Sequence, residues 1–333
     1  MRKHVYKLIL GFLRLLPPEF AGSLSLKFIK FNFLISKRIS RRNASNLSKQ
    51  SPVKYKHLNF KNYLGIAAGL DKEGRYFPAL GSLGFSFIEV GTFTPVSQYG
   101  NDYPRIKRLK KDKSLINRLG FNNPGIRQGI DNIKRNKKSF SGILGVSIGK
   151  NKDTKLEDAS KDYKYCLRNC FYFSDYIAVN ISSPNTEGLR NLSQESYFFE
   201  LINQIHEEYE NLIKKYKIEV PLLLKLSPDE DDGNIENLLE LSLNKKFSGF
   251  IISNTTQGEL MGIKGGISGE LLKDKSLEML KKVNSLLDQD VLLISSGGIS
   301  SKQDIEERLD NGANLIQIYT SFVYEGPPII DKL

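Results

Sequence analysis

The stretch Tyr176-Ile-Ala-Val-Asn-Ile-Ser-Ser-Pro-Asn-Thr-Glu-Gly-Leu-Arg190 joins a short apolar run to a polar segment that contains proline and glycine. Such a run before such a segment predicts a buried strand that ends in a loop. The hydroxyl, carboxamide and guanidinium groups of the loop suit a small polar, anionic ligand. An ordinary capped turn is the alternative, because serine, asparagine, proline and glycine are also the common turn residues.

Seven further apolar runs of this kind follow residue 60, and each ends in a small or polar residue. They are Leu64–Gly69, Phe85–Thr92, Ile143–Gly149, Leu222–Ser227, Phe250–Thr255, Val291–Gly298 and Leu315–Thr320. Helix-like segments separate most of the runs, for example Glu195–Lys217, Asn234–Asn244, Lys273–Leu287 and Lys302–Asn311. Eight strands that alternate with helices predict a closed (β/α)8 TIM barrel. An open doubly wound sheet is disfavoured, because no Gly-x-Gly-x-x-Gly turn follows the first strand.

The positive charge of the chain is concentrated at its N-terminus. The net charge is +12, and residues 1–50 hold eleven lysines and arginines against the single acid Glu19. That segment therefore carries +10, which leaves +2 for residues 51–333. A nearly neutral body argues against a nucleic-acid partner, which would require basic residues across the binding face.

The N-terminal residues predict two apolar helices edged with lysine and arginine, separated by Pro17-Pro18. Charges interrupt both runs, so neither has the roughly 20 apolar residues of a transmembrane span. We expect residues 1–45 to lie on an anionic membrane surface and residues 46–333 to form the barrel. Packing against the barrel and a mitochondrial transit peptide are the alternatives. Residues 36–53 are expected to be a polar linker.

Cysteine and histidine are scarce in this chain. Cys166 and Cys170 lie four residues apart in a helical pattern, and His4, His57 and His206 are far apart in the sequence. Helix packing is the expected role of the cysteines, and neither a disulfide framework nor a metal site is expected.

In a barrel of this type the active site lies at the carboxyl ends of the strands. Lys225 is notable there, because it interrupts the apolar run Leu222-Leu-Leu-Lys-Leu-Ser and a lysine inside a barrel requires an anion. The alternative is a surface lysine that extends its charge into water. Glycine-rich loops are expected around Gly69, at Gly265–Gly269 and at Gly297-Gly298, and they favour a phosphorylated cofactor, because glycine lets the backbone approach phosphate closely.

Six motifs, in this order, resemble the dihydroorotate dehydrogenase family over essentially the whole chain. They are Ala67-Ala-Gly-Leu-Asp-Lys72, Asn117-Arg-Leu-Gly-Phe-Asn122, Ile148-Gly-Lys-Asn-Lys-Asp153, Asn180-Ile-Ser-Ser-Pro-Asn-Thr186, Ser253-Asn-Thr-Thr256 and Gly326-Pro-Pro328. The N-terminal helices, and serine rather than cysteine at position 183, resemble the quinone-dependent, membrane-associated class 2. The resemblance implies FMN-dependent oxidation of dihydroorotate to orotate in pyrimidine synthesis, with one FMN per subunit.

The resemblance also implies roles for individual residues. Ser183 is the expected catalytic base, and a hydride is expected to pass to flavin N5. The implied cofactor contacts are Ala68, Gly69, Leu70, Asp71, Lys72, Thr92, Ser147, Asn180, Lys225, Ser253, Gly269, Gly298, Tyr319 and Thr320. The implied substrate contacts are Lys72, Asn117, Arg118, Leu119, Gly120, Phe121, Asn180, Asn185, Asn254 and Thr255.

A route for quinone is implied between the two N-terminal helices, lined by Arg108 and Tyr319. We expect a monomer bound peripherally to the cytoplasmic side of the bacterial inner membrane, in preference to the mitochondrial inner membrane. Three positions depart from the family pattern: Ser147 stands where the family has an asparagine that contacts FMN, Ser253 replaces threonine, and Ser296 replaces an apolar residue.

Other functions remain to be weighed against this one. A cytosolic fumarate- or NAD-linked enzyme would share the barrel and FMN, but Ser183 and the basic N-terminus argue against it. A dihydrouridine synthase would require a basic barrel mouth for RNA. A membrane adaptor without enzymatic activity would not explain the lysines and asparagines at the strand ends.

Overall fold

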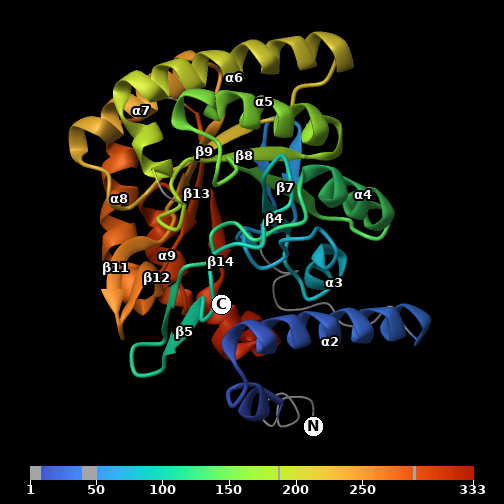
Figure 1. Cartoon of the computed structure of the whole chain (residues 1–333). Coiled ribbons are helices and arrows are strands. Elements are labelled where there is room, and N and C mark those ends of the chain that lie inside the picture. The colour runs from blue at the N-terminus through green and yellow to red at the C-terminus, as the bar shows by residue number, and fades with distance from the viewer. Residues whose placement is uncertain (1–8, 40–50, 187, 288–289) are drawn as a thin grey trace.

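A computed structural model describes residues 9–39, 51–186, 188–287 and 290–333. Its centre is a closed barrel of parallel strands in the order β10-β13-β14-β3-β4-β7-β8-β9, which confirms the predicted (β/α)8 fold and all eight predicted strands (Figure 1). The strands are β3 (Leu64–Ile66), β4 (Phe87–Phe93), β7 (Ile143–Ile148), β8 (Tyr176–Asn180), β9 (Leu222–Lys225), β10 (Gly249–Ile252), β13 (Leu292–Ser296) and β14 (Leu315–Ile318).

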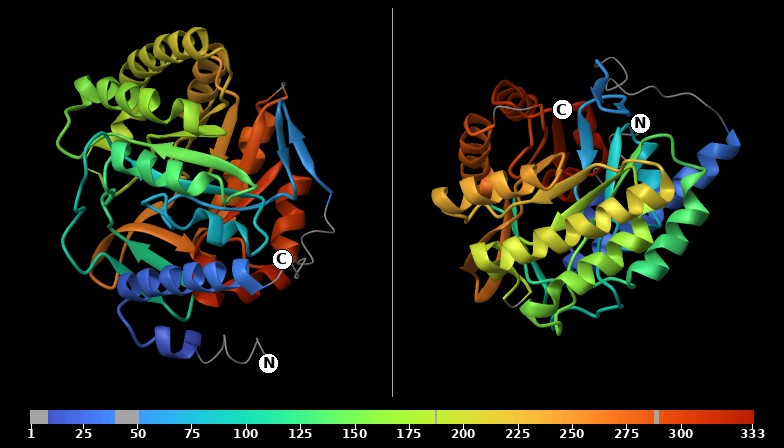
Figure 2. Two further views of the ribbon diagram at one scale, coloured as in Figure 1. Left: turned by 90° about the vertical axis from the view of Figure 1, so that its right-hand side faces the viewer. Right: turned by 90° about the horizontal axis from the view of Figure 1, so that it is seen from above.

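Helices surround the barrel and cover the outer faces of its strands, and α4, α5 and α6 follow one another around the outside (Figure 2). The helices are α3 (Phe77–Gly81), α4 (Ile126–Lys137), α5 (Ala159–Cys170), α6 (Glu195–Tyr216), α7 (Asp232–Asn244), α8 (Lys273–Ser285), α9 (Lys302–Asp310) and α10 (Thr320–Glu325). Short 3-10 segments span Leu156–Asp158, Phe171–Phe173, Leu189–Ser193, Glu270–Leu272 and Pro327–Asp331. Cys166 and Cys170 are free and buried in α5, where they pack in the core between strands and helices.

A second core fills the inside of the barrel. The hairpin β1 (Val53–Tyr55) and β2 (Leu58–Phe60) closes the barrel at one end, and Tyr55, Leu58 and Phe60 pack against inward-facing side chains of the barrel strands. This hairpin leaves the opposite end, where the strands finish, for the site.

A four-stranded antiparallel sheet stands beside that opposite end. It contains β5 (Ile106–Leu109), β6 (Ser114–Asn117), β11 (Thr256–Leu260) and β12 (Ile263–Gly269), in the order β11-β12-β6-β5. The segment Gly265–Gly269, which we expected to be a loop, is therefore part of a strand. Its glycines serve close packing, because a Cβ at Gly265 would lie 2.2 Å from the carbonyl oxygen of Asn117.

The N-terminal segment is helical over residues 9–13, turns at Pro17, and continues as α2 (Pro18–Ile39). Figures 1 and 2 show α2 lying along the end of the barrel that carries the site, near the C-terminal segment. Residues 1–8 and 40–45 of the predicted membrane segment lie outside the described residues. Of the expected linker 36–53, residues 36–39 belong to α2 and Val53 begins β1, while residues 40–50 lie outside the described residues. None of the helices described is both long enough and apolar enough to cross a membrane.

Candidate active site

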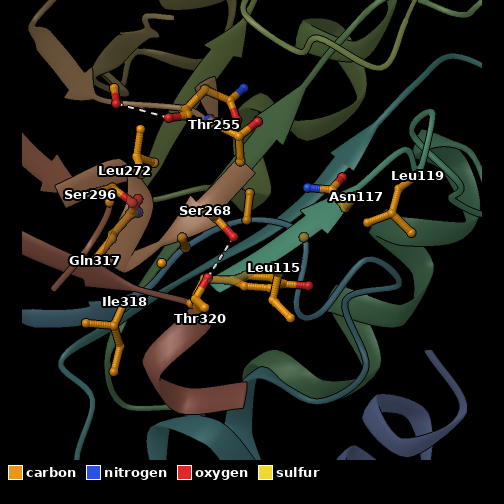
Figure 3. A pocket seen from close by; sticks show the side chains of 18 of the residues that line it. Leu115, Asn117, Leu119, Thr255, Ser268, Leu272, Ser296, Gln317, Ile318 and Thr320 are labelled. Atoms are coloured by element: carbon orange, nitrogen blue, oxygen red, sulfur yellow. Dashed lines mark hydrogen bonds between the residues drawn. The ribbon is translucent and has the colours of Figure 1, made fainter. Parts of the chain in front are cut away.

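One large cavity opens where the barrel strands end, and it lies between these ends and the four-stranded sheet. Figure 3 shows part of its wall, where Ser268 of β12 and Thr320 after β14 are joined by a hydrogen bond of 2.8 Å between their hydroxyl oxygens. Leu115 and Asn117 of β6 also line the cavity. The cavity is therefore built from loops on the barrel and from the added sheet.

Most of the residues implied by the sequence meet in this cavity. They are Ala68, Gly69, Lys72, Thr92, Asn117, Leu119, Gly120, Phe121, Asn180, Ser183, Asn185, Lys225, Ser253, Asn254, Thr255, Gly269, Gly298, Tyr319 and Thr320. They lie on or shortly after the barrel strands β3, β4, β8, β9, β10, β13 and β14, or on or beside the added sheet. Segments far apart in the sequence thus converge on one space, as the barrel geometry predicts.

Five implied residues lie outside the cavity lining: Leu70, Asp71, Arg108, Arg118 and Ser147. The Asp71 carboxylate is fully buried and accepts backbone hydrogen bonds from Arg75, Tyr76 and Phe77, so it holds the turn that leads into α3. Ser147 is buried behind Thr92, and their hydroxyl oxygens are 2.9 Å apart. Leu70 packs on the barrel core.

The Ser183 loop is fixed by carboxamide groups from neighbouring strands. Ser183 is buried, and its Oγ accepts a 3.3 Å hydrogen bond from the backbone N–H of Asn185. The side chain of Asn185 donates to Asn117 Oδ1 at 2.8 Å. Asn254 Nδ2 donates to Asn180 Oδ1 at 3.3 Å and to Ser182 Oγ at 3.0 Å. Together these groups offer donors and acceptors to a ring rich in amide groups.

Arg190 holds this loop against the next one. Its Nε donates to the carbonyl of Ser182, and its Nη2 donates to the carbonyl of Thr255 at 2.9 Å. Its Nη1 pairs with Asp229 Oδ2 at 2.6 Å. Burial alone would raise the pKa of Asp229, but hydrogen bonds from Lys275, Thr256, Gln257 and Arg190 outweigh burial and lower this pKa to about 2. The guanidinium that suggested ligand recognition is thus occupied in positioning two loops.

Two lysines bring positive charge into the cavity. Lys72 Nζ donates to Asn122 Oδ1 at 2.6 Å, and burial lowers the pKa of Lys72 to about 8 although Glu19 opposes the shift. Lys225 is buried within the barrel and lies 3.5 Å from Glu89 Oε1. Lys225 is therefore an inward-facing lysine paired with a carboxylate, and the surface alternative is wrong.

The Gly297-Gly298 turn is shaped by a buried arginine and by glycine geometry. Gly298 has φ +70°, and a Cβ there would lie 2.3 Å from the Cα of Lys273, so only glycine fits. Arg308 Nη2 donates to the carbonyls of Gly297 and Lys273, and burial lowers the pKa of Arg308 to about 10. The turn leads into α9, so its backbone can approach an anionic group closely.

The N-terminal helices contact the barrel beside this cavity. Arg108 donates to the carbonyl oxygens of Leu13, Arg14 and Leu16, of which Leu16 is nearest at 2.8 Å. It therefore satisfies the carbonyl groups where the first helix ends. Glu19 at the start of α2 forms an ion pair with the buried Arg105. Tyr319 lines the cavity, and burial raises its pKa to about 12.

Several lining residues were not predicted from the sequence. Gln317 and Ser296 face each other in register on β14 and β13, and both line the cavity (Figure 3). Gln317 had a usable signal, because it interrupts an apolar run just as Lys225 does. Leu115 on β6 and Lys113 in the turn before β6 had none, because they belong to the added sheet and not to the barrel pattern. Ser268 lies in the segment Gly265–Gly269, which was singled out only for its glycines.

Three buried polar atoms of lining residues have no hydrogen-bond partner among the described residues: Asn185 Oδ1, Gln317 Oε1 and Ser321 Oγ. Buried polar groups are normally paired, so these atoms are available to a polar occupant. Within the described ranges no group of three or more histidine, cysteine or acidic side chains is arranged to hold a metal ion.

The fold and the cavity define a (β/α)8-barrel enzyme whose ligand site lies at the carboxyl ends of the strands. Residues 51–333 match the family model described as dihydroorotate dehydrogenase. The chain belongs to the dihydroorotate dehydrogenase family, whose members are flavin-dependent oxidoreductases.

Relatives named "Dihydroorotate dehydrogenase (quinone)" support this assignment. One from Idiomarina loihiensis is 42% identical over 288 residues and covers 85% of this chain and 86% of its own. One from Wigglesworthia glossinidia brevipalpis is 41% identical and covers 99% of this chain and 98% of its own. Among solved structures, Eimeria tenella DHODH in complex with ferulenol has a TM-score of 0.84, 30% identity and coverage of 94% of this chain and 89% of its own.

Proposed function

We propose that the chain oxidises (S)-dihydroorotate to orotate with a membrane quinone as electron acceptor, in de novo pyrimidine synthesis. One observation carries this proposal. Ser183, a shell of asparagine side chains and Lys72 line the same cavity as Lys225 and the Gly297-Gly298 turn. A proton-accepting hydroxyl and an anion-binding lysine therefore share one enclosed space with a place for a phosphorylated cofactor.

Ser183 acts as the base that removes a proton from the substrate. A serine hydroxyl is a weak base in water, so it depends on a positioned network and on exclusion of water. The burial of Ser183 and the fixed N–H of Asn185 provide such a setting. Lys72 binds the substrate carboxylate, and the side chains of Asn117, Asn185 and Asn254 bind the ring.

The cavity also fits FMN, one per subunit. Lys225, Gly269, Gly298, Tyr319 and Thr320 are the residues that would hold it. The glycines at 269 and 298 have positive φ and no room for a Cβ, and Gln317 Oε1 is a buried acceptor that awaits a donor. When bound, FMN supplies the hydride acceptor at N5 and passes the electrons to quinone.

Residues 1–45 form the membrane and quinone-entry segment, and residues 46–333 form the catalytic barrel. Large apolar side chains are exposed here, including Leu15 at 83%, Phe31 at 61% and Phe20 at 60%. Such a surface suits contact with the acyl region of a bilayer, and the nearby basic residues suit anionic lipid. We place the protein as a monomer on the cytoplasmic side of a bacterial inner membrane, with the quinone route passing Tyr319 and Arg108.

A stopped-flow experiment tests the two half-reactions separately. The purified flavoprotein is mixed anaerobically with dihydroorotate and then with a short-chain ubiquinone, while flavin absorbance is followed. Bleaching by dihydroorotate and recovery with quinone are expected. Bleaching without recovery would assign the protein to a fumarate- or NAD-linked class, and absence of bleaching would refute dihydroorotate as substrate.

A further inference from the structure

A buried polar cluster lies inside the barrel, next to the cavity. It consists of Glu89 on β4, Tyr176 on β8, Lys225 on β9 and Gln317 on β14. Glu89 Oε2 accepts hydrogen bonds from the Tyr176 hydroxyl at 3.0 Å and from Gln317 Nε2 at 2.9 Å, and Glu89 Oε1 lies 3.5 Å from Lys225 Nζ. Three strands thus place inward-facing polar side chains around the carboxylate of a fourth.

The contacts of Glu89 match the hydrogen-bonding capacity of a carboxylate. Its three partners are all donors, and a carboxylate accepts hydrogen bonds through both of its oxygens. Burial raises the pKa of Tyr176 well above its usual value, so this phenol remains a neutral donor. Gly145 makes the contact possible, because a Cβ there would lie 2.1 Å from the Tyr176 ring. A fully buried carboxylate is costly without paired charge, and Lys225 supplies that charge.

Two partners of Glu89 line the cavity, whereas Glu89 itself lies behind them. Because Gln317 Nε2 donates to Glu89, the amide cannot turn over without placing its oxygen against a carboxylate. Gln317 Oε1 therefore stays available, buried and without a partner among the described residues. Lys225 is 3.5 Å from Glu89, longer than the usual 2.7–2.9 Å of such pairs, so its ammonium group can also donate to a ligand.

We propose that Glu89 is a positioning residue for the flavin site, which it serves in two ways. It orients the Gln317 amide and Lys225 toward the cofactor, and it offsets the charge of Lys225. This proposal rests on the flavin assignment made above. Lys225 alone would favour the reduced, anionic ring over the oxidised ring, and the Glu89 carboxylate moderates that preference. Glu89 thereby sets the reduction potential of the flavin from behind the cavity wall.

The test is a spectroelectrochemical titration of the flavin in the holoenzyme. Glu89→Gln should raise the potential, because Lys225 then faces the ring without a compensating charge. We expect the dissociation constant of oxidised FMN, divided by that of reduced FMN, to rise tenfold or more. A tenfold rise in this ratio raises the potential of a two-electron couple by about 30 mV. Tyr176→Phe is the matched control, since it removes a donor to the same carboxylate and leaves the charges intact. In Tyr176→Phe the ratio of the two dissociation constants should change by less than threefold.

Further variants separate charge balance from packing. The double variant Glu89→Gln/Lys225→Gln removes both charges, so its potential should return toward the wild-type value. Glu89→Asp shortens the side chain by one methylene and so moves the carboxylate away from Lys225, which should raise the potential by an intermediate amount. This variant also provides the test if Glu89→Gln does not fold. An unchanged potential in Glu89→Gln, or in Glu89→Asp where that is the folded variant, would overturn the proposal. A wild-type protein that binds no flavin would instead overturn the proposed function, before any variant is compared.

Discussion

The barrel mouth and the N-terminal segment use their side chains in opposite ways. At the mouth, polar groups are paired with one another: the buried Lys225 with the buried Glu89, Asn254 with the buried Asn180, and Arg190 with Asp229. In the N-terminal segment, apolar groups such as Leu15 and Phe31 are exposed. Buried polar groups and exposed apolar groups are each costly in water unless a partner is present. The comparison teaches that one region is built for a polar ligand and the other for an apolar surface.

The largest expected effect comes from the polar region, through Ser183→Ala. Removal of the base should lower the rate of flavin reduction by dihydroorotate by about 100- to 10,000-fold, the usual range for general base catalysis. The cofactor should remain bound, because Ser183 is not among the proposed cofactor contacts. Anaerobic stopped-flow absorbance measures the rate, and the flavin spectrum measures the content.

Ser182→Ala is the control for this experiment. Ser182 is the adjacent buried serine, and its hydroxyl accepts from Asn254 at 3.0 Å. Its loss should reduce the rate only several-fold, because it removes one neutral hydrogen bond. If Ser183→Ala kept a rate near that of the wild type, or if Ser182→Ala were the slower variant, Ser183 would not be the base.

A second experiment concerns the charge of Lys72. Because burial lowers its pKa to about 8, Lys72 is a cation at pH 7 and mostly neutral at pH 9. An anionic ligand therefore loses its partner as pH rises. Orotate should bind about tenfold more weakly at pH 9 than at pH 7, from a one-proton equilibrium centred near this pKa. Isothermal titration calorimetry at the two pH values measures the change.

Lys72→Arg separates this lysine from other titrating groups. Arginine stays charged through pH 9, so orotate affinity in this variant should lose its decline with pH. A decline of the same size in Lys72→Arg would assign the effect to another group in the cavity, and a flat wild-type profile would contradict the role of Lys72.

The sequence predicted the barrel better than it predicted the surroundings of the site. The barrel strands are buried on both faces and therefore appear as short, mainly apolar runs, as in Gly249-Phe-Ile-Ile252. The strands of the added sheet do not: β11 is half exposed along its length, and β12 contains adjacent glycines that normally indicate a loop. Gly266 is glycine because a Cβ would lie 2.2 Å from Thr255 Oγ1, a contact that no local pattern reveals.

The site shows the same division. Site residues that lie in family motifs or at strand ends were predicted from the sequence, whereas the side-chain contacts that give residues a structural role were not. Asp71 lies in a motif, yet its carboxylate caps a turn, and Arg190 lies in the central loop, yet it connects two backbone segments. Glu89 stands out as an acid within the buried strand β4, but its proposed function depends on side chains from three other strands. Pairing across a barrel is a property of the closed sheet, so it cannot be derived from one segment.

The smallest effect on chemistry is expected from the apolar region, through Leu15→Ser/Phe31→Ser. Each side chain would lose about 1.5–3 kcal/mol of apolar transfer free energy if it enters lipid. Vesicle binding should therefore weaken tenfold or more, and turnover with a lipid quinone should fall several-fold. Flavin reduction by dihydroorotate should not change, because the cavity is intact. Flotation with anionic vesicles and the two half-reaction rates measure these effects.

Point substitutions are sharper here than deletion of the helices, because deletion would leave the buried Arg105 without Glu19. Tyr172→Ser/Phe199→Ser is the matched control: these side chains are 60% and 51% exposed but lie on the barrel, after α5 and on α6. If the control weakened vesicle binding as much as Leu15→Ser/Phe31→Ser did, general surface hydrophobicity would explain the binding. If neither pair changed it, the basic residues alone would account for membrane contact, and the exposed apolar face would need another partner.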